Sequence, residues 1–99
     1  MISIQEKNGG LLATIEGRLD TPSALKAGQE MAPLMENADK VITLDCSKLE
    51  YISSSGLRLF LALRKETASK GGKVIIEGIT ENVSKVFQMT GFFNLFEIR

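Results

Sequence analysis

Apolar and polar residues alternate in the first two segments of the chain. The alternation runs from Ile2 to Glu6 and returns from Leu11 to Glu16. A period of two residues is typical of a strand that buries one face. Between the two segments, Asn8-Gly9-Gly10 suits the positive φ angles of a tight hairpin turn. The pattern predicts that the chain opens with a β-hairpin.

A helix start is indicated at Thr21-Pro22. Threonine can cap the free N–H groups of a first turn, and proline suits the first helical position. Pro33 lies deep in this segment and should kink or break the helix between Gln29 and Ala32. One face of the predicted helix carries small and apolar residues, namely Leu25, Gly28, Ala32 and Met35.

Two continuously apolar runs follow, as expected for buried strands. They are Val41–Leu44 and Val74–Ile76. A helix is predicted between them from about Gly56 to Lys70. Gly71-Gly72 should end that helix, because glycine readily adopts the left-handed C-cap conformation.

The C-terminal part predicts one more helix, Glu81–Thr90, followed by Gly91. Its apolar face would hold Val83, Val86, Phe87 and Thr90. A short final strand is predicted at Leu95–Glu97. The element order is then ββαβαβα(β), in which strands separated by helices run parallel. We therefore expect an α/β fold, a single domain over residues 1–99 without a linker, with helices packed on a mixed sheet of four or five strands.

Composition narrows the function. The chain has 99 residues, with 12 basic and 12 acidic side chains and no net charge, so nucleic acid is not an expected partner. The N-terminus lacks the pattern of a signal peptide, and the longest apolar run, Leu59–Leu63, is too short to cross a bilayer. We expect a cytoplasmic protein without direct membrane insertion.

The absence of histidine excludes several kinds of catalytic site. With no histidine and a single cysteine, Cys46, the chain cannot form a Ser-His-Asp triad, a Cys-His triad or a Cys/His zinc site. Gly71–Val74 reads GGKV, which is not a nucleotide-binding Walker loop. We predict no metal, no cofactor and no enzymatic activity. Cys46 itself is expected in the core, as are Met31, Met35 and Met89.

Three consecutive serines, Ser53–Ser55, precede Gly56 at the expected junction of strand and helix. Functional groups in open α/β sheets gather beyond the carboxyl ends of the strands. Asp45 is expected at the end of the third strand and Asp20 beyond the second strand. Both carboxylates would then flank the serines.

The serines allow three interpretations. One serine can cap the helix, although one cap is enough. A nucleophilic serine is disfavoured, because Ile52 stands where the hydrolase elbow has glycine and no histidine can act as base. A phosphate acceptor is compatible with a helix N-terminus and would add about −1.5 to −2 charges to a neutral surface.

The segment LDCSKLEYISSSGLRLFLAL, Leu44–Leu63, resembles the core motif of STAS domains, in particular that of bacterial anti-sigma factor antagonists. IEGRLDTPSA, Ile15–Ala24, looks like the Gly-x-Leu-Asp segment of that family. Gly71–Ile98 is similar to the last strand and helix of the family. The resemblance covers nearly the whole chain and implies a small mixed sheet with helices packed against it.

The resemblance also implies regulation of transcription by partner switching. An unmodified antagonist binds an anti-sigma factor, which is a serine kinase with an ATP-binding fold. Phosphorylation two residues before the motif glycine, here at Ser54, dissociates the complex, and a metal-dependent serine phosphatase resets it. Ser53, Ser55, Gly56, Asp20 and Asp45 would be the neighbours of the phosphorylation site. Asp20 matches the aspartate of the family segment.

The sequence departs from the family pattern in two places. Ser53 stands where the best-studied type has aspartate. This chain therefore has two neighbouring hydroxyls as possible phosphate acceptors, and it lacks one carboxylate of the family pattern. The chain stops at Arg99, where many relatives continue into a further helix, so the domain is minimal or a partner covers that face. A different function also fits the family: a constitutive STAS subunit of a membrane lipid-transport ATPase.

The helix predicted at Gly56–Lys70 is apolar over a wide arc, which is more than one sheet contact requires. A neighbouring helix could cover the excess. The other interpretation is a partner-binding edge at Leu61, with Arg58 and Lys65 as its polar rim.

Overall fold

A computed structural model describes residues 1–99 and contains a five-stranded sheet of order β1-β2-β3-β4-β5. The antiparallel hairpin of β1 (Ile2–Lys7) and β2 (Gly10–Leu19) forms one side. Parallel strands β3 (Val41–Ile52), β4 (Lys73–Glu77) and β5 (Glu97–Ile98) complete the sheet. The opening hairpin and the mixed sheet confirm the predicted fold class.

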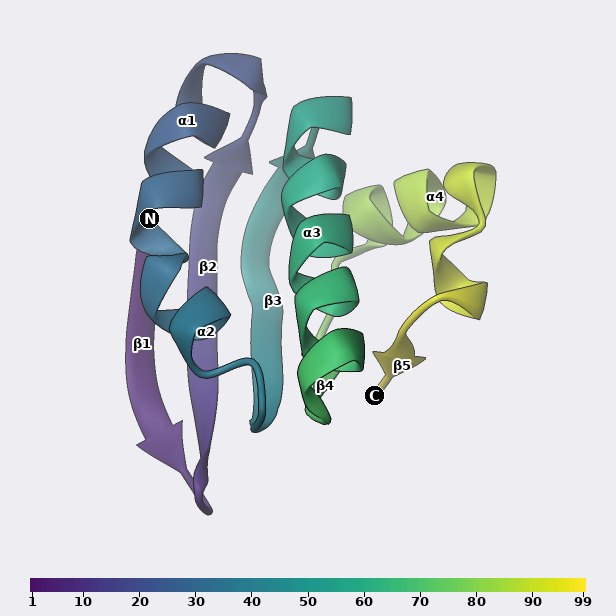
Figure 1. The fold of residues 1–99 in the computed structure, drawn as a ribbon. Helices are drawn as coiled ribbons and strands as arrows, with labels where there is room; N and C mark the ends of the chain where they lie inside the picture. Colours follow the sequence, from purple (N-terminus) through teal and green to yellow (C-terminus); the bar gives the residue numbers. More distant parts are fainter.

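Three helices lie together over one face of the sheet (Figure 1). They are α1 (Thr21–Glu30), α2 (Ala32–Glu36) and α3 (Ser54–Lys70). Helix α4 (Glu81–Thr90) contacts β3 and leads into the 3-10 turn η1 (Phe92–Asn94); in Figure 1 both are seen on the opposite side of α3 from α1. Gly71 and Gly91 have φ angles of 86° and 77°, so the predicted glycine caps end α3 and α4.

The core lies between the sheet and the helices. The inward positions of β2, β3 and β4 join one cluster of 20 buried residues with the buried faces of the helices. Phe60 of α3 and Phe87 of α4 are its two largest fully buried side chains. Burying a side chain of this kind contributes about 1.5–3 kcal/mol to folding. Cys46 and Met31 belong to the same cluster, as predicted.

The first helix differs from its prediction by one residue. Asp20, not Thr21, is the N-cap of α1, and Thr21 is the first helical residue. The buried face accordingly contains Ala24 and Ala27, continued by Met31 and Leu34, while the predicted Leu25 is 77% exposed. The break predicted near Pro33 is present, because α1 ends at Glu30 and α2 begins at Ala32.

The third strand is longer than predicted. It continues past Leu44 as far as Ile52, because β2 extends alongside it and supplies parallel partners up to the pair Leu19 and Ile52. The continuous apolar run ends at Leu44 because Asp45 is polar, whereas the strand itself continues to Ile52. The burial prediction for Met89 is also wrong, since this side chain is 86% exposed on α4.

The chain end has two short elements instead of one. Phe92–Asn94 forms η1, and the final strand is Glu97–Ile98, later than the predicted Leu95–Glu97. None of the helices combines the length and apolar character that a bilayer crossing needs.

Candidate functional site

The carboxyl ends of β2 and β3 meet at one edge of the sheet, the upper edge in Figure 1. Leu19 pairs with Ile52, and the backbone N–H of the next residue, Ser53, donates a 2.9 Å hydrogen bond to the carbonyl oxygen of Leu19. Asp20 follows β2 directly and Ser53 follows β3 directly. The first turns of α1 and α3 therefore begin side by side.

Asp20 is fully engaged in starting α1. Its Oδ1 accepts a hydrogen bond from the backbone N–H of Ser23 at 3.1 Å, and Ser23 Oγ accepts one from the backbone N–H of Asp20 at 3.0 Å. These two bonds form a capping box. Hydrogen bonds from Ser23, and to a smaller extent the charge of Arg18, lower the pKa of Asp20 from its ordinary value. The carboxylate is thus a structural cap with a fixed negative charge.

The serines occupy three different environments. Ser53 is the N-cap of α3: its Oγ accepts a 3.2 Å hydrogen bond from the backbone N–H of Gly56, and only 9% of the residue is exposed. Ser54 and Ser55 are the first two residues of α3, which therefore begins two residues before the predicted Gly56. The Oγ of the half-buried Ser55 accepts a 3.2 Å bond from Arg58 Nη2.

Of these three serines, only Ser54 is exposed and has a hydroxyl that is not held by a protein hydrogen bond. It lies on the outer side of the first turn of α3. This is the position at which a modifying enzyme could reach a serine without unfolding the helix.

Gly56 allows α3 to begin close to the strand ends. A Cβ atom built on Gly56 would lie 2.7 Å from Leu19 Cγ and 2.9 Å from Ile52 Cγ1, which is closer than carbon atoms can pack. The glycine is buried within the helix. The absence of a side chain at this position thus permits close packing of α3 on the ends of β2 and β3.

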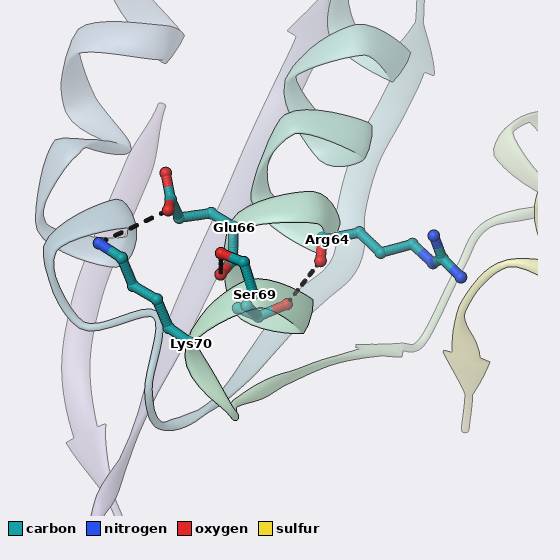
Figure 2. Close-up of polar contacts among 5 residues, drawn as sticks. Arg64, Glu66, Ser69 and Lys70 are labelled. Atoms are coloured by element: carbon teal, nitrogen blue, oxygen red, sulfur yellow. Dashed lines mark hydrogen bonds and ion pairs between the residues drawn. The ribbon is translucent and has the colours of Figure 1, made fainter.

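The side chains proposed as a binding edge lie along α3. Arg58 and Lys65 are exposed and belong to no ion pair, whereas Leu61 is half-buried against the core cluster. The other cations of the C-terminal half of α3 are engaged: Lys70 pairs with Glu66 at 3.5 Å, and Arg64 Nε donates to the carbonyl oxygen of Leu95. Figure 2 shows Arg64 extending away from Glu66 and Lys70 toward the C-terminal segment.

Asp45 does not lie at this edge, so the prediction that it flanks the serines is wrong. It pairs with Thr14 and Glu77 in the middle of the sheet, well before Ile52 at the end of β3. At ~3.3 Å per residue the separation is roughly 20 Å along the strand. Its Oδ1 accepts a 3.0 Å hydrogen bond from the backbone N–H of Ser47, which lowers the pKa of Asp45.

Sequence reasoning missed an exposed pair at the carboxyl ends of β2 and β3. The guanidinium carbon of Arg18 lies 4.5 Å from the centre of the Tyr51 ring, a cation–π contact. The two residues are cross-strand partners, each one position before the last residue of its strand. The parallel register of β2 and β3 brings them together, and register is not visible in one sequence.

The one thiol of the chain, that of Cys46, lies in the core and not at this edge of the sheet. Burial raises the pKa of the Cys46 thiol to about 12, so it remains protonated near neutral pH. No group of three or more Cys, Asp or Glu side chains is arranged to hold a metal ion. The available chemistry is an exposed hydroxyl on the first turn of α3, with the guanidinium of Arg58 in the same part of the helix.

Comparison with known proteins places this arrangement in a family, since the model of the STAS domain matches residues 1–99. The chain belongs to the STAS domain family. Its curated relatives include the anti-sigma-B factor antagonist of Bacillus subtilis, which is 26% identical over 98% of this chain and 88% of that protein. BtrV of Bordetella bronchiseptica, described as a candidate anti-sigma factor antagonist, is 27% identical over 98% of this STAS domain and 84% of the relative.

Solved structures share the fold. The anti-sigma factor antagonist SpoIIAA in its unphosphorylated form superposes with a TM-score of 0.81 at 20% identity, over 100% of this chain and 88% of SpoIIAA. The phosphorylated form of the same Bacillus protein gives a TM-score of 0.74 at 18% identity, over 100% of this chain and 91% of that one. At these identities the likeness concerns the fold.

Proposed function

We propose that this STAS domain is an anti-sigma factor antagonist that works by partner switching. The observation that carries the proposal is the free, exposed hydroxyl of Ser54 on the first turn of α3. The other two serines are less suited, because Ser53 is buried as a cap and Ser55 is bonded to Arg58. The names of the relatives, which are anti-sigma factor antagonists, support the same function.

In this proposal the unmodified domain binds an anti-sigma factor that is also a serine kinase, and the sigma factor is free. The kinase transfers the γ-phosphoryl group of ATP to Ser54 Oγ. The hydroxyl proton is lost and ADP leaves. A serine phosphatase later hydrolyses the phosphate ester with water and restores the hydroxyl.

The phosphate acts through charge. It adds about −1.5 to −2 charges at a position where the first turn of α3 has no acidic residue. The positive end of the helix dipole tolerates this charge within the domain. A partner surface that was complementary to the neutral hydroxyl would instead lose contacts and face a charge that it cannot solvate. Phosphorylation therefore releases the partner without unfolding the antagonist.

The proposed binding surface runs from Ser54 along α3 through Arg58, Leu61 and Lys65. Arg58 and Lys65 are exposed and can change partners at little cost. Leu61 is partly packed on the core, so a charged residue there would also cost stability. Loss of partner affinity in Leu61→Ala and in Arg58→Ala, with both variants shown to be folded, is therefore a cleaner test of this surface than a charged residue at position 61.

The decisive experiment is intact-mass measurement and phosphopeptide mapping of the chain isolated from its own host, with and without phosphatase treatment. We expect a single phosphate on Ser54 that disappears in Ser54→Ala and persists in Ser55→Ala. Absence of phosphate under every growth condition would reject the switch and favour a constitutive STAS subunit of a membrane lipid-transport ATPase.

A second variant tests the departure from the family motif. Ser53→Asp restores the aspartate of the best-studied relatives and keeps a good N-cap residue. If the cognate kinase reads this position, the rate of Ser54 phosphorylation will differ between the natural chain and the Ser53→Asp variant. Equal rates would show that the kinase does not need the carboxylate.

A further inference from the structure

We propose that Arg58 is the internal counter-ion of a phosphate on Ser54, an inference that rests on the proposed function. Phosphorylation would then add negative charge and also withdraw the guanidinium of Arg58 from the binding surface. The proposal makes Arg58 a sensor of the modification, in addition to its place in the rim of the partner-binding edge.

The position of Arg58 on α3 provides the first support. Ser54 and Arg58 are four residues apart in the same helix, so they are neighbours on its surface, with Cβ atoms about 5–6 Å apart. Long helical side chains point back toward the N-terminus. Arg58 follows this rule, since its Nη2 already donates a 3.2 Å hydrogen bond to Ser55 Oγ in the first turn.

The second support is that the guanidinium of Arg58 has no ionic partner. No carboxylate pairs with Arg58, and the first turn of α3 contains no acidic residue. At present Arg58 donates a hydrogen bond to the neutral hydroxyl of Ser55. A hydrogen bond from the guanidinium to a phosphate on Ser54 would be stronger, because a bond between two charged groups is about twice as strong as a neutral one, and it would therefore replace the bond to Ser55. The planar fork of arginine can also donate two parallel N–H bonds to phosphate oxygens.

Two other charged groups, Arg18 and Asp20, lie at the same edge of the sheet, and each already has a partner there. From the neighbouring β2 end, Arg18 is stacked on Tyr51, and at the start of α1 the carboxylate of Asp20 is held by Ser23. Asp20 would repel a phosphate, and Arg18 would attract it. Both groups remain the same in every variant considered below, so differences between the variants report on α3 alone.

The test uses a chain in which phosphoserine is incorporated at position 54 during translation, so that no kinase is needed. The ³¹P NMR signal of the phosphate is followed between about pH 4 and about pH 8, a range that spans its second pKa near 6. Three further phosphorylated chains are compared with the natural one: Arg58→Gln, Arg58→Lys and Lys65→Gln. Circular dichroism verifies that each chain is folded.

We expect the second pKa of the phosphate to be lower in the natural chain than in Arg58→Gln, by about half a unit or more, because an opposite charge within reach favours the dianion. Arg58→Lys should fall between the two, since lysine keeps the charge but not the fork. Lys65→Gln should match the natural chain, because Lys65 lies eleven residues from Ser54, or about 16 Å along the helix axis.

Equal titration of the natural chain and Arg58→Gln would overturn the proposal. So would a Lys65→Gln shift as large as that of Arg58→Gln, because the effect would then come from net charge and not from contact. This failure is distinct from failure of the proposed function. A phosphate absent from Ser54 in the host removes the switch, whereas an unchanged titration removes only the role of Arg58.

Discussion

The backbone N–H of Ser53 donates a hydrogen bond to the carbonyl oxygen of Leu19 at 2.9 Å. This bond joins the first residue after β3 to the last residue of β2, and so it fixes the beginning of α3 next to the beginning of α1. Asp20 and Ser53 then cap two neighbouring helices from the same edge. The exposed Ser54 owes its position to this junction.

Gly56→Ala should destabilise the domain by about 1–3 kcal/mol, as overpacking of a core does. Its added Cβ would collide with Leu19 and Ile52, the two residues that form the junction. On helix propensity alone the substitution would stabilise by up to about 1 kcal/mol, so the sign of the change separates the two effects. Urea unfolding measures it.

Gly28→Ala is the matched control for that experiment. A Cβ at Gly28 meets only the end of the Leu59 side chain, at 3.3 Å, and this side chain can move. We expect a smaller loss of stability, or a gain from helix propensity. If Gly56→Ala were no worse than Gly28→Ala, the close approach of α3 to the strand ends would be refuted.

Ser53→Ala should cost about 1 kcal/mol of stability, because the backbone N–H of Gly56 loses its capping oxygen. Ser53→Asp should retain most of the stability, since aspartate is an equally good cap. Ser54→Ala removes a hydroxyl that bonds to nothing and should change the unfolding midpoint very little. Thermal unfolding of the three variants would contradict this assignment if Ser54→Ala were the most damaging.

Cys46 should resist thiol reagents in the folded protein. The side chain is fully buried, and burial raises the pKa of its thiol from 9.0 to about 12. The reactive thiolate is therefore nearly absent at pH values near neutrality. Labelling with a maleimide should be slow in buffer and rapid in denaturant, and comparable rates in both would indicate an exposed thiol.

The same thiol gives the stability a dependence on alkaline pH. The pKa of Cys46 is higher in the folded chain than in the unfolded chain. The protonated thiol therefore contributes fully to the free energy of unfolding below about pH 9, and this contribution is lost as the pH rises toward about 12. Cys46→Ala should weaken this decline, although it lowers stability at neutral pH by removing buried volume. An unchanged alkaline slope in the variant would assign the decline to other groups.

Asp20 should contribute to stability above its ordinary pKa of 3.8 and lose that contribution as pH falls. The sign follows because hydrogen bonds from Ser23 lower the pKa of Asp20 in the folded chain, so protonation favours unfolding. Ser23→Ala should raise the pKa of Asp20 toward its ordinary value, as an NMR titration of the carboxyl carbon would show. Asp20→Asn keeps a capping oxygen and should flatten the acid side of the stability curve.

Local patterns in the sequence were sufficient for most of the elements. The hairpin, the break near Pro33 and the glycine-terminated helices each depend on residues within a few positions, and local backbone preferences decide them. The same holds for the placement of a serine cap at the start of α3. The cap of α1 shows where local patterns stop being sufficient. Asp20 and Thr21 are adjacent and both are good capping residues, so the sequence did not show which of them caps the helix.

The sequence by itself determined the fold class, the apolar strands and the run of hydroxyls where a strand leads into a helix. Only the tertiary structure decided which groups meet. Because β3 pairs in parallel with the whole of β2, it extends to Ile52, and Asp45 therefore lies far from the serines. The same pairing places Arg18 against the ring of Tyr51. These outcomes depend on contacts between β2 and β3, which are far apart in the chain, and the hydrophobic pattern within one segment does not show which distant residue it will meet.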